Sequence, residues 1–216
     1  MKKPLILIFL ILIVDQALKF FIKLNFSIGE EINLIGSWCR IHFLENEGMA
    51  FGMSFGGNWG KLILTLIRII ASILIFIYLR KIIKKKEPKL LIYSMALIFA
   101  GAVGNIIDSL FYGLIFSSSS LFNVATIFQG GYAPFLFGKV VDMFYFPIIN
   151  TTLPEWIPII GGNHFQFFNA VFNIADASIT IGIILLIWFA FIPKNKETSP
   201  KDTSVLVPEE ENTTKE

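Results

Sequence analysis

The chain has 216 residues, of which 55% are hydrophobic and only 16% are charged, and its mean hydropathy is +0.70. This composition excludes an ordinary soluble domain and favours a membrane protein. The formal net charge of +2 says little about partners, while the single cysteine, Cys39, excludes an internal disulfide framework and a cysteine-based metal cluster.

Four segments are long and apolar enough to cross a bilayer, which takes about 20 helical residues for about 30 Å of hydrocarbon. The first follows Lys2 and Lys3 as a secretory signal would, but no small-residue cleavage site comes after it, so we interpret it as a retained span. The sequence therefore predicts an all-α membrane protein with four transmembrane helices, at about residues 4–24, 61–79, 90–110 and 167–192.

The basic residues indicate how these spans are oriented. Twelve of the 18 lysines and arginines lie before the first span, between the second and third spans, or after the fourth. Cytoplasmic loops carry the excess of basic residues in membrane proteins. We therefore expect both termini and the 80–89 loop to be cytoplasmic, and residues 25–60 and 111–166 to lie on the outer face.

The two outer regions differ in pattern. Residues 25–60 alternate between apolar and polar side chains, which predicts a small β-containing region at the membrane surface. Residues 111–166 contain a run of four serines and two Gly-Gly pairs, which predicts loops with little regular structure. These regions and the spans form one predicted domain, residues 1–193, and the charged tail at 194–216 is predicted to be disordered and cytoplasmic.

Polar side chains recur at helical spacing inside the apolar segments. Positions 169, 173, 176 and 180 are separated by four, three and four residues, which predicts one polar stripe on the last helix. The third segment repeats these offsets at positions 101, 105, 108 and 112. In the first segment Asp15 lies one turn before Lys19, and we expect the two to pair. A charge inside a bilayer costs about 2.5 to 3.5 kcal/mol, so the remaining carboxylates, Asp108, Asp142 and Asp176, indicate function rather than packing.

Five motifs follow one another along the chain, "VDQALKFFIK", "ENEGMAFGM", "GAVGNIIDSLFYG", "GKVVDMFYFP" and "FNIADASITIG". In this order they resemble the successive motifs of the lipoprotein signal peptidase, or signal peptidase II, family. The resemblance implies an aspartic endopeptidase of the bacterial inner membrane with its active site toward the outer face. It also implies the reaction, which is removal of the signal peptide from diacylglyceryl-modified prolipoproteins by a cut before the lipidated cysteine.

The resemblance also implies roles for individual residues. The catalytic pair of the family falls on Asp142 and Asp176. Two carboxylates in a low-dielectric cleft cannot both ionise easily, so they share a proton and can serve as base and acid in peptide hydrolysis. A structural ion pair falls on Asp15 and Lys19. Residues that orient the substrate or the carboxylates fall on Asn46, Gly48, Asn105, Asp108 and Asn173.

Two features depart from the family pattern. Ser109 follows Asp108 where the family usually has an arginine, so either another cation, Arg68 or Lys139, replaces it or the contact is missing. Asp108 and Asp142 are also farther apart in the chain than family members usually place them. We interpret the additional residues, at about 116–137, as an inserted outer loop.

The residues alone leave other functions open. A small proton-coupled carrier would also hold carboxylates in the membrane interior, but carriers usually distribute them along a path and often contain repeats. Here they gather toward one face and no repeat is evident. A structural membrane subunit leaves the polar stripes unexplained. No H-E-x-x-H or G-x-S-x-G motif is present, and no metal, cofactor or nucleic acid is implied, so the expected partners are a lipidated prolipoprotein and membrane lipid.

Overall fold

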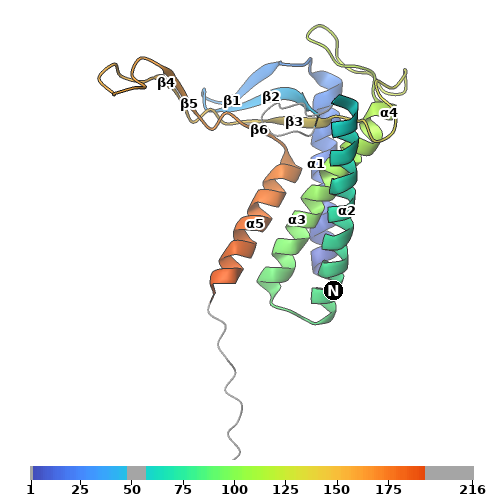
Figure 1. Cartoon of the computed structure of the whole chain (residues 1–216). Coiled ribbons are helices and arrows are strands. Elements are labelled where there is room, and N and C mark those ends of the chain that lie inside the picture. The colour runs from blue at the N-terminus through green and yellow to red at the C-terminus, as the bar shows by residue number, and fades with distance from the viewer. Residues whose placement is uncertain (1, 48–56, 193–216) are drawn as a thin grey trace, which may run out of the picture.

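The structure is a computed structural model that describes residues 2–47 and 57–192 (Figure 1). Within these ranges four helices are long and apolar enough to cross a membrane. They are α1 (Lys2–Asn25), α2 (Gly57–Lys84), α3 (Lys89–Ile107) and α5 (Ile174–Phe191). The prediction of four membrane helices with a small β region is confirmed, whereas Gly48 and the predicted tail at 194–216 lie outside the described residues.

Helix α3 is the centre of the bundle, because it contacts α1, α2 and α5. Glycines allow the close approach of its neighbours. A Cβ atom at Gly101 would lie 2.2 Å from the carbonyl oxygen of Ala175, and one at Gly104 would lie 2.9 Å from a carboxylate oxygen of Asp15. Small residues at such crossings are typical of membrane helices, where packing replaces the hydrophobic effect as the cause of association.

The outer end of α3 changes its helical winding. The helix continues into a π-helical turn, η2 (Asp108–Tyr112), and a final short turn, α4 (Gly113–Ile115). Such π-turns are rare and occur often at functional sites. Asp108 and Tyr112 are both fully buried, as is most of Asn105 one turn earlier, so the predicted polar stripe of this segment faces the protein interior.

The last helix begins later than predicted, at Ile174 and not at residue 167. The Asn173 side chain accepts a hydrogen bond from the Asp176 backbone N–H at 2.9 Å, and the Asp176 carboxylate accepts one from the Asn173 N–H at 3.4 Å. This reciprocal capping box fixes the start of the helix. The predicted stripe over positions 169–180 is therefore wrong in its first half, because Asn169 and Asn173 precede the helix.

A four-stranded antiparallel sheet lies across one end of the bundle (Figure 1). Its order is β1-β2-β3-β6, and the strands are β1 (Glu31–Ile35), β2 (Cys39–Asn46), β3 (Val140–Tyr145) and β6 (Val171–Phe172). The β2–β3 register pairs Leu44 with Asp142 and Asn46 with Val140. This pairing brings the asparagine of the second motif beside the aspartate of the fourth.

The second outer region is more regular than predicted. It contains β3 and β6, together with a separate antiparallel pair formed by β4 (Ile149–Thr152) and β5 (His164–Phe167). The prediction of little regular structure is wrong for residues 140–172, because these strands depend on partners distant in the chain. Residues 117–137 agree with the predicted loop, since one isolated bridge, between Phe116 and Ile127, is its only regular pairing in the structure as described.

The two ends of the bundle differ in composition. The N-terminus, the α2–α3 connection and the last turn of α5 lie at the end opposite the sheet (Figure 1). Two of the basic segments used above to predict orientation, residues 2–3 and 80–89, therefore lie at one end of the described structure, and the strands of the outer regions lie at the other. Which end faces the cytoplasm remains a prediction from the distribution of lysine and arginine.

Candidate active site

Two carboxylates meet where the sheet joins the bundle, and one asparagine links them. Asp142 lies in β3, and Asp176 lies in the first turn of α5. The Asn173 side chain donates to Asp142 Oδ1 at 2.7 Å while its own oxygen accepts from the Asp176 backbone N–H. Asn173 is fully buried, so its hydrogen bonds are shielded from water. The helix cap thus also holds the two acidic side chains in a fixed relation.

Two further asparagines donate to this carboxylate pair, Asp142 and Asp176. Asn46 donates to Asp142 Oδ2 at 3.1 Å, and Asn105 donates to Asp176 Oδ1 at 2.7 Å. Asn105 in turn accepts from the Asn173 amide at 3.1 Å. Four of the predicted site residues in β2, β3, α3 and α5 thereby form one connected hydrogen-bond network with the cap residue. Amides suit this role because they donate to a carboxylate and accept from a neighbour at once.

Burial and the neighbouring charge raise the pKa of Asp142 to about 7. Loss of hydration is the larger cause, since only 3% of the side chain is exposed, and the negative charge of Asp176 adds to it. Hydrogen bonds from Asn46 and Asn173 act in the opposite direction, because they stabilise the ionised form. Near neutral pH Asp142 can therefore hold a proton.

The buried lysine Lys19, on α1, contacts the network. The Lys19 ammonium lies 2.9 Å from Asp15, 2.8 Å from Asp108 and 2.9 Å from the side-chain oxygen of Asn105. The expected pair with Asp15 is confirmed, and Asp108 is a second partner of the same lysine. The π-helical turn that begins at Asp108 brings this carboxylate to the lysine from the opposite helix.

Asp15 and Asp108 also hold in place the elements that carry Asp142 and Asp176. Asp15 Oδ1 accepts from the Ala175 backbone N–H at 2.9 Å, which ties α1 to the first turn of α5. Asp108 accepts from the Val141 N–H at 3.3 Å, which ties η2 to β3. Gln16, which we did not predict, donates to Asp108 at 2.9 Å and accepts from Tyr112. Its only signal in the sequence is a polar side chain beside Asp15 in an apolar helix.

A second lysine, also missed by sequence reasoning, anchors the inserted loop. Lys23 is fully buried, forms an ion pair with Glu45 and donates to the Ser119 hydroxyl at 2.8 Å. Its ammonium also lies 4.9 Å from the centre of the Tyr132 ring. Two residues of the loop therefore contact one cation at the end of α1. The sequence signal was the position of Lys23, one turn after Lys19.

The comparisons with known proteins bear on this network. The family model described as "Signal peptidase (SPase) II" matches residues 7–192, which include the whole network. The chain belongs to the signal peptidase II family. The resemblance predicted from the five motifs is confirmed, and the comparisons give no support to a carrier.

Relatives in the signal peptidase II family match over most of their length. A lipoprotein signal peptidase of Porphyromonas gingivalis is 44% identical over 206 residues, which cover 92% of this chain and 89% of the relative. One from Amoebophilus asiaticus is 35% identical and covers 82% and 73% of the two chains. A bacterial membrane enzyme solved at 1.9 Å resolution is 26% identical, with a TM-score of 0.58 over 90% of this chain and 96% of that one.

Ser109 occupies the position at which the signal peptidase II family usually has an arginine. Ser109 is buried and donates to the Asn105 backbone carbonyl at 3.0 Å. Of the two candidate replacements, Lys139 lies 3.7 Å from Glu45 and 3.6 Å from Glu47. The guanidinium of Arg68, on α2, instead experiences the charges of the site, and Asp176 contributes the largest share.

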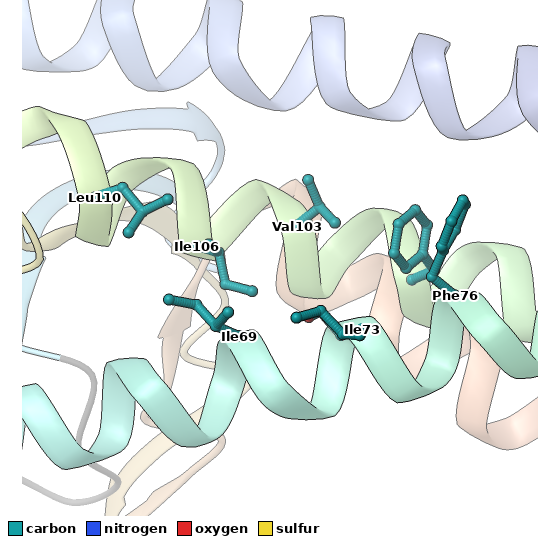
Figure 2. A pocket seen from close by; sticks show the side chains of 8 residues that line it. Ile69, Ile73, Phe76, Val103, Ile106 and Leu110 are labelled. Carbon is teal, nitrogen blue, oxygen red and sulfur yellow. The ribbon is translucent and has the colours of Figure 1, made fainter.

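An apolar groove of about 330 Å³ runs between α2 and α3. Figure 2 shows its two walls, with α2 below and α3 above. Ile106 on the α3 wall directly follows Asn105 of the network, so the groove reaches the level of the carboxylate pair along α3. The side chains labelled in Figure 2 are Ile69, Ile73, Phe76, Val103, Ile106 and Leu110.

Proposed function

We propose that this protein is an aspartic endopeptidase of the bacterial inner membrane that removes the signal peptide from diacylglyceryl-modified prolipoproteins, cutting before the lipidated cysteine. The observation that carries the proposal is the buried pair of carboxylates, Asp142 and Asp176, linked through Asn173. Membership of the signal peptidase II family supports the reaction, since the relatives are lipoprotein signal peptidases.

The chemistry divides between the two carboxylates. Asp176 accepts a proton from a water molecule as that water attacks the scissile carbonyl carbon, and protonated Asp142 donates to the carbonyl oxygen. The tetrahedral intermediate then collapses as Asp176 gives its proton to the amide nitrogen, which leaves, while one hydroxyl of the intermediate returns a proton to Asp142. The raised pKa of Asp142, to about 7, supports its assignment as the acid. Asn46 and Asn105 keep the carboxylate planes oriented through their hydrogen bonds.

The substrate enters sideways from the bilayer in this proposal. Both termini lie in the cytoplasm and the carboxylate pair opens toward the outer face, which the basic segments at the opposite end of the bundle support. The apolar groove between α2 and α3 accommodates part of the signal helix or an acyl chain. Arg68 takes over the positioning of the substrate backbone from the arginine that Ser109 replaces, which its electrostatic coupling to Asp176 supports.

The proposed function is tested by cleavage in vitro. Purified protein is given one prolipoprotein with and without the diacylglycerol on its cysteine. Cleavage only of the lipidated form, at the bond before the cysteine, is the expected result. A protein that cleaves neither form while it conducts protons in liposomes would be a carrier, and one that does neither would be a structural subunit.

Asn173→Ala is expected to lower both activity and stability. It removes the helix cap, which typically contributes about 1 kcal/mol, and leaves Asp142 without its shorter amide hydrogen bond. The misplaced carboxylates should slow cleavage by about 10²-fold, the usual cost of a 1 Å error in position. Single-turnover rates and thermal unfolding in detergent measure both effects. Asn169→Ala is the matched control, because Asn169 is exposed and outside the network, and equal rates for the two variants would contradict the role of Asn173.

The pH dependence of cleavage follows from Asp142. A general acid must be protonated, and the pKa of Asp142 is raised to about 7. The value of kcat/KM should therefore fall as pH rises above about 7, and the limb should approach a tenfold loss for each further pH unit. A profile of kcat/KM from pH 5 to 9 measures it. An activity that keeps rising to pH 9 would contradict the assignment of Asp142 as the acid.

A further inference from the structure

A two-stranded ribbon extends sideways from the sheet, beyond the helix bundle (Figure 1). It consists of β4, β5 and the connecting turn at residues 153–163, and within the described residues its strands pair only with each other. An isolated two-stranded hairpin is at best marginally stable in water. The ribbon would therefore be stabilised by a surface on which it could lie.

The strand register makes the ribbon amphipathic. Ile149 pairs with Phe167 and Thr151 with Phe165, so these side chains share one face. On the other face Thr152 pairs with His164, and Gln166 lies two residues further along β5, so the described side chains there are polar. Ile149, Phe165 and Phe167 remain 40–52% exposed, so the protein itself does not cover the apolar face.

The tip of the ribbon is apolar and exposed. Trp156 is 81% exposed and Ile159 is 99% exposed. Ile159 has a φ of 72°, a left-handed conformation that a β-branched residue rarely adopts and that glycine would adopt at no cost. Because Ile159 is almost fully exposed, packing within the chain does not offset the free-energy cost of this conformation. Glu155 is the only charged residue between positions 147 and 172, so electrostatic docking to a charged partner is not favoured.

The backbone of the tip forms its own hydrogen bonds. Leu153 N–H donates to the Asn163 carbonyl at 2.9 Å, and Gly162 N–H donates back to the Leu153 carbonyl at 2.9 Å. Gly161 N–H donates to the Ile157 carbonyl at 3.0 Å. Backbone that enters an apolar phase must satisfy its polar groups internally, because no water is available there. This turn meets that condition at these positions.

We propose that the ribbon lies on the outer surface of the bilayer, with its Ile149, Phe165 and Phe167 face and its Trp156–Ile160 tip in the lipid interface. The ribbon leads through β6 directly into α5, which is long and apolar enough to cross a membrane. At its base Trp38 stacks on Phe146, and tryptophan is enriched at membrane–water interfaces. The inference requires that the four helices span the membrane with the sheet at the outer face, and it is independent of the peptidase assignment.

The experiment places single nitroxide labels on the full chain in lipid nanodiscs of phosphatidylethanolamine and phosphatidylglycerol. Cys39 is the only cysteine, so Cys39→Ala provides the background. Thr151→Cys and Thr152→Cys are a matched pair, because they are neighbouring exposed threonines on opposite faces of the ribbon. Ile159→Cys reports on the tip, and Phe122→Cys, 91% exposed in the inserted loop, is the aqueous control. Collision rates with oxygen and with a water-soluble nickel chelate are measured by electron paramagnetic resonance.

The labels at positions 151 and 159 should collide several-fold more with oxygen, relative to nickel, than the labels at 152 and 122. Equal ratios at 151 and 152, together with a tip as accessible to nickel as position 122, would overturn the proposal. Spin–spin broadening at position 159 in nanodiscs that hold two copies would also overturn it, since a second copy and not lipid would then cover the tip.

Discussion

Lys19→Met is expected to cost the folded protein about 3–5 kcal/mol, the range found when one partner of a buried ion pair is removed. Lys19, Asp15 and Asp108 are at most 1% exposed, so the variant leaves two carboxylates buried without their cation. It also removes the donor to the side-chain oxygen of Asn105. Thermal unfolding and the folded fraction after gel filtration in detergent measure the loss.

Removing the carboxylates along with the lysine should restore folding. Lys19→Met with Asp15→Asn should recover part of the folded protein, and the further change Asp108→Asn should recover more, because Lys19 contacts both acids. Lys84→Met is the matched control, since Lys84 is exposed at the end of α2. If Lys19→Met unfolds at the same temperature as Lys84→Met, the lysine does not support the site.

Asp142→Asn and Asp176→Asn are each expected to abolish cleavage while the protein folds and binds lipidated substrate. Asparagine nearly preserves the shape of aspartate but cannot exchange the proton. General acid or base catalysis contributes about 10² to 10⁴-fold, and groups that act as one unit are not additive, so the double variant should be about as inactive as either single one. Asp108→Asn should retain measurable turnover, because Asp108 contacts Lys19 and Val141 and not the carboxylate pair.

The stability of Asp142→Asn shows whether the variant is inactive because it lacks the group that transfers the proton or because it does not fold. The pKa of Asp142 is raised to about 7 in the folded protein, so this carboxyl lowers the stability progressively as pH rises from about 4 to 7, and the full cost applies above pH 7. At pH 8 the variant should therefore unfold at the same or a higher temperature than the unsubstituted protein. The difference should vanish below about pH 4, where the carboxyl is protonated in both states. Glu155→Gln, an exposed acid in the ribbon turn, is the control and should change neither property.

The sequence predicted the bundle because its signals are local. A span needs about 20 apolar residues, and hydropathy along the chain reports this directly. The stripe at Asn105, Asp108 and Tyr112 follows from helical periodicity, and these residues are buried as expected. The start of α5 was missed because the apolar residues of β5 and β6 extend the hydropathy of the helix toward the N-terminus. The Asn173–Asp176 spacing was the signal for a helix cap there.

The rest of the site depends on contacts between distant segments. Val141 and Asp142 form a strand because β2 pairs with them, and a pattern within residues 111–166 does not contain that partner. In the sequence Gln16 and Lys23 are single polar residues in an apolar helix. Their partners, Asp108 and Ser119, are distant in the chain and come into contact with them only in the fold. Five family motifs predicted the members of the network, but only the fold relates Lys19 to both Asp15 and Asp108.

The most direct test of the aspartic mechanism is single-turnover cleavage of a lipidated prolipoprotein by purified, folded Asp176→Asn protein in excess over substrate. Excess enzyme removes product release from the observed rate, so the measurement reports the chemical step alone. Asp176 is the proposed base, so the substrate should bind and remain intact over times in which the unsubstituted protein completes the reaction. Cleavage by the variant at a near-normal rate would contradict the account.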